Sequence, residues 1–156
     1  MPRVHPSPGS LRPGTEPDID TPARILLVED DDDIRVLARM IIDLDLYMQH
    51  EVFEVTNGYD AIRVCSEVRP HVMVLDLNLP QISGLHVLRA VRATPMAPCV
   101  IAWSADPWAR QGALNSGADY AYDKGDEVTG LLETIENCLL TCHPANPSDP
   151  WRASAS

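Results

Sequence analysis

The chain alternates short, unbroken apolar runs with segments whose apolar residues recur at helical spacing. Ile25–Val28 is the first apolar run. The segment after it carries a helical stripe made of Ile34, Leu37, Ala38, Ile41 and Leu44. Strands that are apolar at every position are typical of a sheet buried on both faces. The alternation therefore predicts a parallel sheet covered by helices.

The same strand–helix unit occurs five times. Further strands are predicted at 50–55, 72–75, 99–103 and 120–122, and further helices at 61–68, 85–91, from 107 and at 128–139. Asp106 followed by proline predicts a helix start, and Asp126 is a candidate cap for the last helix. Right-handed crossovers then give an α/β fold with a doubly wound sheet, which binds ligands at the carboxyl ends of its strands. No glycine-rich fingerprint or Walker motif follows the first strand, so a nucleotide site is not expected.

Length and charge limit the other possibilities. The 156 residues suit one domain at 23–142, between a proline-rich leader at 1–22 that we expect to be disordered and a flexible tail at 143–156. The net charge is −11, and −10 of it belongs to 23–142. This excess of acid disfavours a nucleic-acid partner. No apolar stretch is long enough for a membrane span and no signal peptide is recognisable, so no membrane partner is expected.

The four cysteines are Cys65, Cys99, Cys138 and Cys142, and they show no zinc spacing. Cys138 and Cys142 lie four residues apart on the apolar stripe of the last helix, which indicates core packing. With no secretion signal, we interpret all four as reduced thiols of a cytoplasmic protein.

Polar residues lie just past the ends of four of the five predicted strands. They are Glu29 and Asp30, Asp76, Ser104, and Lys124, the only lysine beside eleven arginines. In this architecture they converge on one edge of the sheet. Carboxylates, a hydroxyl and an ammonium suit Mg²⁺ together with a phosphoryl group, and a carboxylate can itself accept that group. A calcium loop on Asp30–Asp33 fits poorly, because the sixth position is never glycine.

The stretches "ILLVEDD", "VMVLDLNLP" with Gly84, "VIAWSA" and "GADYAYDK" resemble the receiver domain of bacterial two-component response regulators. The resemblance covers 23–142 and implies a flavodoxin-like sheet with strand order 2-1-3-4-5 and five helices. It implies a phosphoprotein of two-component signal transduction that promotes its own phosphorylation and dephosphorylation. Such a protein is not expected to be an enzyme. After Cys142 only fourteen residues remain, so we expect a stand-alone receiver with output by protein contact or phosphorelay.

The resemblance also implies a role for each residue of the edge. Asp76 would accept the phosphoryl group from a sensor histidine kinase or a histidine phosphotransfer protein, and the protein would then act on a downstream protein target. Ser104 would hydrogen-bond the phosphoryl group, and Lys124 would pair with its oxygens. The metal ligands would be Asp30, Asp76, the backbone carbonyl of Asn78 and, through water, Glu29. Asn78 and Asp106 occupy positions that tune phosphoryl lifetime, and their types favour a short one.

Two positions depart from the family pattern. An aromatic switch residue is often found three residues before the lysine, where this chain has Ala121. Tyr120 and Tyr122 flank it but point to the opposite face of a strand. The residue after the lysine is usually proline and is Gly125 here, which leaves the backbone freer. These departures call into question how a phosphorylation signal reaches the last strand and helix.

Three functions therefore compete. The first is the phosphorylatable receiver, and the second is a receiver-like interaction module that does not switch by phosphorylation. The third is an aspartyl-nucleophile phosphatase. It is disfavoured because that class has its Asp-x-Asp nucleophile motif after the first strand, whereas the carboxylate with turn residues around it here, Asp76, lies after the third.

Three smaller expectations concern individual residues. Glu29 and Asp30 are assigned to the metal, and Asp31, Asp32 and Asp33 to the start of the next helix, where one can act as cap. Trp103 is expected in the core and Trp108 at the surface. His71 is expected at the surface, and no histidine receives a function.

Overall fold

The computed structural model describes residues 22–141. Apart from Pro22, the predicted leader lies outside the described residues, as do Cys142 and the predicted tail. Within the described range, no helix is both long and apolar enough to cross a membrane.

Within residues 22–141, five parallel strands form one sheet in the order β2-β1-β3-β4-β5, as predicted. The strands are β1 (Ala23–Val28), β2 (His50–Val55), β3 (Val72–Asp76), β4 (Cys99–Ser104) and β5 (Tyr120–Asp123). All residues of β3 and β4 are buried, and so are the last four of β1. Apart from Asp76 and Ser104 at the ends of β3 and β4, these residues form the apolar runs that a sheet covered on both faces requires.

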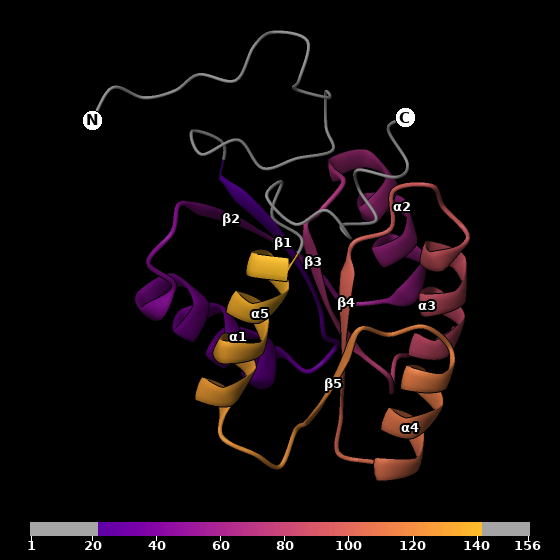
Figure 1. Ribbon diagram of the computed structural model, residues 1–156. Helices are drawn as coiled ribbons and strands as arrows, with labels where there is room; N and C mark the ends of the chain where they lie inside the picture. Colours follow the sequence, from indigo (N-terminus) through magenta and orange to yellow (C-terminus); the bar gives the residue numbers. More distant parts are fainter. Residues whose placement is uncertain (1–21, 142–156) are drawn as a thin grey trace, which may run out of the picture.

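In the described part of the chain, five helices cover the two faces of the sheet (Figure 1). They are α1 (Asp32–Asp45), α2 (Gly58–Val68), α3 (Gly84–Arg92), α4 (Pro107–Asn115) and α5 (Val128–Thr141). Helices α1 and α5 pack on one face, and α2, α3 and α4 on the other. Asp106 accepts a hydrogen bond from the backbone of Trp108 and caps α4, as predicted. Among residues 22–141, no hydrogen bond to the side chain of Asp126 caps α5, contrary to the prediction.

The apolar stripe of α1 is only partly the buried face that the sequence predicts. Ala38 and Ile42 are buried, whereas Leu37 and Leu44 are 47% and 74% exposed. Leu37, Met40 and Leu44 are three and four residues apart and form a second, outward face of the helix. Apolar residues recur at helical spacing on both faces of α1, so spacing alone does not show which face is buried.

His71, predicted at the surface, is buried just before β3. The backbone N–H of Arg24 donates a hydrogen bond of 2.9 Å to its Nδ1 atom. Burial, with a smaller contribution from the Arg24 charge, lowers the pKa of His71 to about 4. The imidazole is therefore neutral in the fold at neutral pH and accepts a bond that fixes the start of the sheet.

We expect His71 to make the protein less stable in mild acid. The folded pKa of about 4 lies below the ordinary value of 6.5, so this stabilisation is complete above pH 6.5 and is lost as the pH falls toward 4. In urea unfolding, wild type should lose on the order of 2 kcal/mol more than His71→Asn between pH 7 and pH 5. Asparagine keeps an acceptor for the Arg24 amide but does not titrate. Parallel pH profiles of the two proteins would contradict this assignment.

The interpretation of all four cysteines as reduced thiols is wrong for two of them. Cys99 and Cys138 form a disulfide, with Cα atoms 6.0 Å apart. The first residue of β4 and the buried face of α5 meet in one core cluster, which brings together two cysteines 39 residues apart. Cys65 is a buried free thiol whose pKa is raised by burial to about 11.

Candidate functional site

The carboxyl edge of the sheet brings together the residues predicted to meet there. The residues that end or directly follow β1, β3, β4 and β5 include Glu29, Asp30, Asp76, Ser104 and Lys124. Because the four strands run parallel, their carboxyl ends share one edge. The placement follows from topology, since these residues span almost a hundred positions of the chain.

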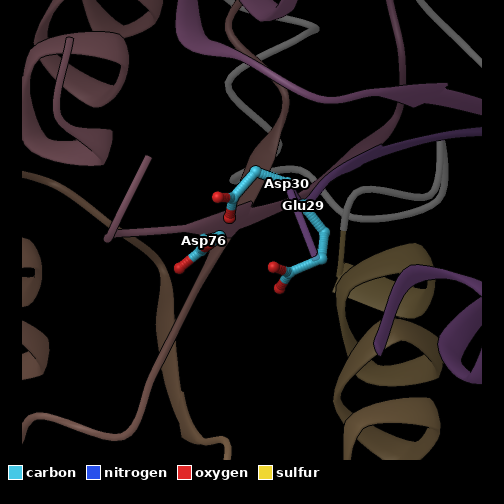
Figure 2. Close-up of side chains that lie close together, drawn as sticks. All are labelled: Glu29, Asp30 and Asp76. Atoms are coloured by element: carbon cyan, nitrogen blue, oxygen red, sulfur yellow. The ribbon is translucent and has the colours of Figure 1, made fainter. Parts of the chain in front are cut away.

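Three carboxylates gather at this edge (Figure 2). One oxygen from each of Glu29, Asp30 and Asp76 lies within 4.8 Å of the others. Glu29 and Asp76 are buried, and Asp30 is exposed. Buried carboxylates this close together repel one another unless cations offset their charge.

Lys124 supplies one such cation. Its Nζ atom lies 2.6 Å from Oε2 of Glu29 and 3.1 Å from Oδ1 of Asp76. The ammonium also lies 5.1 Å from the centroid of the Trp103 ring, a cation–π distance. Burial lowers the pKa of Lys124, but the two carboxylates outweigh burial and raise it overall, so the group is charged.

Asp76 ends β3 with its carboxylate almost fully enclosed. The backbone N–H of Asn78 donates to Oδ1 at 2.9 Å. Burial is the main cause that raises the pKa of Asp76 to about 7, and the Glu29 charge adds to it, whereas the Asn78 amide and Lys124 oppose it. The fold therefore holds a carboxyl group that needs additional positive charge to be fully ionised at neutral pH.

Gly84 allows α3 to begin against the end of β3. A Cβ atom at this position would lie 2.5 Å from the backbone oxygen of Asp76 and 2.5 Å from Cα of Leu77. Its N–H donates to the Leu77 carbonyl at 3.1 Å. Glycine is thus required at position 84, because any side chain there would clash with the backbone of Asp76 and Leu77 beside the acidic cluster.

A cleft of about 460 Å³ opens beside Asp76. Ser104, Lys124 and the loop after β4 contribute to its lining. The Ser104 hydroxyl oxygen accepts a hydrogen bond of 3.1 Å from the backbone N–H of Asp106. The cleft gives a small anionic group access to a carboxylate, a hydroxyl and an ammonium.

The run of five acids divides as the sequence predicts. Glu29 and Asp30 belong to the cluster, whereas Asp31 caps α1 through its bond with the Ile34 amide. Asp32 and Asp33 lie in the first turn of that helix, where negative charge interacts favourably with the helix dipole.

The aromatic residues also lie where they were expected. Trp103 is buried in the core cluster that also contains the buried residues of α5, and Trp108 is 85% exposed. Tyr122 packs on the α1–α5 side of the sheet and Ala121 on the other. The Tyr122 hydroxyl donates to the backbone oxygen of Glu127 at 2.6 Å. Neither flanking tyrosine therefore replaces an aromatic side chain at position 121.

Sequence reasoning missed two charged residues next to the site, Arg110 and Asp123. Arg110 on α4 contacts the carboxyl end of β4 and the carboxylate of Asp123, the residue before Lys124. The position of Asp123 beside the only lysine was a signal that could have found it. Arg110 carries no comparable signal, because its contacts depend on how α4 packs.

Comparison with known families gives one decisive match. The model of the response regulator receiver domain matches residues 25–136. The chain belongs to the response regulator receiver family. Receiver domains are signalling modules phosphorylated on an aspartate by histidine kinases, and they bind Mg²⁺ in an acidic site.

Relatives of known name share this receiver. The transcriptional regulatory proteins TrcR and PrrA of Mycobacterium tuberculosis are 30% identical over 152 residues and 37% identical over 121 residues. The matches cover 96% and 76% of this chain, but only 54% and 51% of the relatives. The chain thus spans about half the length of these relatives. Their names lend no support to the predicted absence of a nucleic-acid partner.

A solved receiver shows the same fold. The receiver domain of a sensor histidine kinase from Pseudomonas aeruginosa, with a magnesium ion coordinated in its active site cleft, superposes with a TM-score of 0.69 at 22% identity. The superposition covers 76% of this chain and 98% of that domain. This likeness confirms the flavodoxin-like arrangement of the receiver.

Proposed function

We propose that this receiver accepts a phosphoryl group on Asp76 from the phosphohistidine of a sensor histidine kinase or a histidine phosphotransfer protein. The buried Asp76 carboxylate at the wall of an open cleft carries this proposal. The Asn78 amide and Lys124 both engage Oδ1. No hydrogen bond or ion pair within residues 22–141 engages Oδ2, so one oxygen is held while the other is left for reaction.

The donor set fits Mg²⁺. Glu29, Asp30 and Asp76 provide hard carboxylate oxygens within 4.8 Å of one another, and Mg²⁺ prefers a few carboxylates completed by water and phosphate oxygens. We assign Asp30, Asp76 and the Asn78 carbonyl as ligands, with Glu29 acting through water. The bound cation would offset the negative charge that carboxylates and phosphoryl oxygens bring together.

The residues of the chain divide the remaining work. An oxygen of Asp76 forms a bond to phosphorus while the phosphorus–nitrogen bond of the phosphohistidine breaks, and the imidazole of the donor leaves. Lys124 neutralises charge on the transferring oxygens, and the Ser104 hydroxyl donates a hydrogen bond to one of them. The Ser104 oxygen that now accepts from Asp106 lies at the wall of the same cleft.

The proposed receiver acts in the cytoplasm as a signalling protein, not as an enzyme with a separate substrate. It passes the signal on by protein contact or phosphorelay, and Asn78 and Asp106 favour a short phosphoryl lifetime. The exposed Leu37, Met40 and Leu44 on α1 offer an apolar surface for a protein partner. Because the relatives are about twice as long, the proposal concerns what the receiver itself does, and its stand-alone character stays a prediction.

A second candidate is the receiver-like module that binds its partner without switching. It is favoured by Ala121 at the aromatic switch position and by the bond that ties Tyr122 to Glu127. Equal affinity of the unphosphorylated and phosphorylated protein for its partner would support this candidate.

Acetyl phosphate with Mg²⁺ tests the proposed function without knowledge of the kinase. Intact-mass spectrometry should show one added phosphoryl group on wild type, and chelation of the metal with EDTA should prevent the addition. A known receiver labelled in parallel provides the control. If that receiver is labelled and this protein gains no mass, the proposed function is wrong.

A further inference from the structure

Lys124 occupies the second position of a tight turn between β5 and α5. The backbone N–H of Asp126 donates to the Asp123 carbonyl at 3.1 Å and closes the turn. Gly125 is the third residue, where receivers usually have proline. A glycine gives such a turn more freedom in the absence of other restraints, so something else must fix the direction in which the lysine leaves the turn.

The side chain of Asp123 provides a restraint inside the turn. Its Oδ1 atom accepts a hydrogen bond of 2.8 Å from the backbone N–H of Gly125, a local bond typical of aspartate in turns. Proline could not donate this bond. A Cβ atom on residue 125 would lie 3.3 Å from the same oxygen, so glycine also leaves room for the carboxylate.

Arg110 on α4 connects this turn to the strand that carries Ser104. Its Nη2 atom lies 3.4 Å from Oδ2 of Asp123, and Nη1 donates to the Ser104 carbonyl at 2.8 Å. The backbone N–H of Lys124 donates to that carbonyl at 3.3 Å. The Arg110 side chain is only 20% exposed. One guanidinium therefore restrains both the end of β4 and the residue before the lysine.

We propose that Arg110 and Asp123 are positioning residues that hold Lys124 toward Asp76 and so compensate for the missing proline. The expected effect on the labelling rate rests on the proposed function, whereas the expected position of the Lys124 ammonium does not. A lysine side chain is long and flexible, so its direction needs a restraint. The planar guanidinium of Arg110 provides one because two of its nitrogens contact two segments at once in a fixed geometry. The contribution lies in preorganisation, because the ammonium reaches the carboxylate before the phosphoryl group arrives.

The variant Asp123→Asn separates positioning from simple charge. It removes the carboxylate that pairs with Arg110 and keeps an oxygen for the Gly125 amide. If only charge mattered, losing an acid beside an acidic site would speed the reaction with the anionic acetyl phosphate. Positioning predicts the opposite sign: we expect a labelling rate about 5–10-fold below wild type, with the Mg²⁺ concentration for half-maximal rate unchanged.

The matched control is Asp126→Asn, which removes one acid from the same turn. Asp126 is exposed and its side chain forms no hydrogen bond or ion pair within the described residues. We expect its labelling rate to stay within about twofold of wild type. Arg110→Met should resemble Asp123→Asn, and the double variant should be no slower than the slower single one, because both changes break one connection.

Trp103 fluorescence gives a readout that does not depend on phosphorylation. The Lys124 ammonium lies 5.1 Å from the Trp103 ring, so release of the lysine should change the emission of this tryptophan. In a Trp108→Phe, Trp151→Phe background, Asp123→Asn should shift the emission and Asp126→Asn should not. Equal emission and equal rates for the two variants would overturn the inference. If wild type is never labelled, the proposed function fails, and the emission comparison alone still decides whether Arg110 and Asp123 position the lysine.

Discussion

The variant Asp76→Asn should show no added phosphoryl group after incubation with acetyl phosphate and Mg²⁺. The change replaces the proposed nucleophilic oxygen with an amide nitrogen and leaves the shape of the side chain almost unaltered. Asp76 is the acidic side chain that is both buried and in the wall of the cleft. Intact-mass spectrometry over time measures the rate of phosphoryl addition, which should fall by more than about 100-fold.

The matched control for this loss is Asp106→Asn. Asp106 lines the same cleft but is exposed, and asparagine preserves its role as a helix cap. This variant should still gain one phosphoryl group. Labelling of Asp76→Asn at the wild-type rate would show that another residue accepts the group and that the assignment of Asp76 is wrong.

The variant Asp76→Asn should also change how the stability of the fold depends on pH when no metal is added. The pKa of Asp76 is raised to about 7 from the ordinary 3.8, so its stabilising contribution is complete below about pH 4 and is lost as the pH rises toward 7. At pH 8, Asp76→Asn should therefore be more stable than wild type, on the order of 4 kcal/mol. His71 titrates in both proteins and cancels in the comparison. Urea unfolding at pH 5 and pH 8 measures the difference, and Mg²⁺ should reduce it by stabilising wild type.

The sheet could be predicted from sequence alone, because the apolar composition that buries β1, β3 and β4 in the middle of the sheet is a local property of each strand. A strand segment buried on both faces is apolar at successive positions, and Ile25–Val28 of β1, residues 72–75 of β3 and residues 99–103 of β4 form such segments. The convergence of Asp76, Ser104 and Lys124 then required only that parallel strands end at one edge. The candidate site was predictable because it follows from topology.

The features that sequence missed depend on contacts between segments far apart in the chain. His71 is buried because β1 presents a backbone N–H to it, 47 positions away. Cys99 and Cys138 meet because α5 packs against β4. Arg110 reaches Asp123 only because α4 and β5 pack side by side. No spacing rule contains these contacts, since each is fixed by the packing of two elements.

The variants Asp30→Ala and Asp33→Ala should differ sharply although they lie three residues apart in one acidic run. Asp30→Ala should lower the rate of Mg²⁺-dependent labelling by about 100-fold or more, since changes outside the ligands themselves already cost 10–100-fold in metal affinity. Asp33→Ala should leave the rate within about twofold and should cost roughly 0.3–1 kcal/mol of stability. Labelling rates measured over a range of Mg²⁺ concentrations, and urea unfolding, provide the two readouts.

The reason for the asymmetry is that the run crosses from one element to the next. Asp30 has an oxygen within 4.8 Å of oxygens of Glu29 and Asp76, so its removal leaves two buried carboxylates with fewer oxygens to hold a cation. Asp33 lies in the first turn of α1, where its charge acts on the exposed N–H groups of the helix. High Mg²⁺ should therefore partly restore labelling of Asp30→Ala and should have no effect on the stability lost in Asp33→Ala. If both variants lost labelling to the same extent, the acidic run would act as one diffuse charge, and the division between metal site and helix start would be wrong.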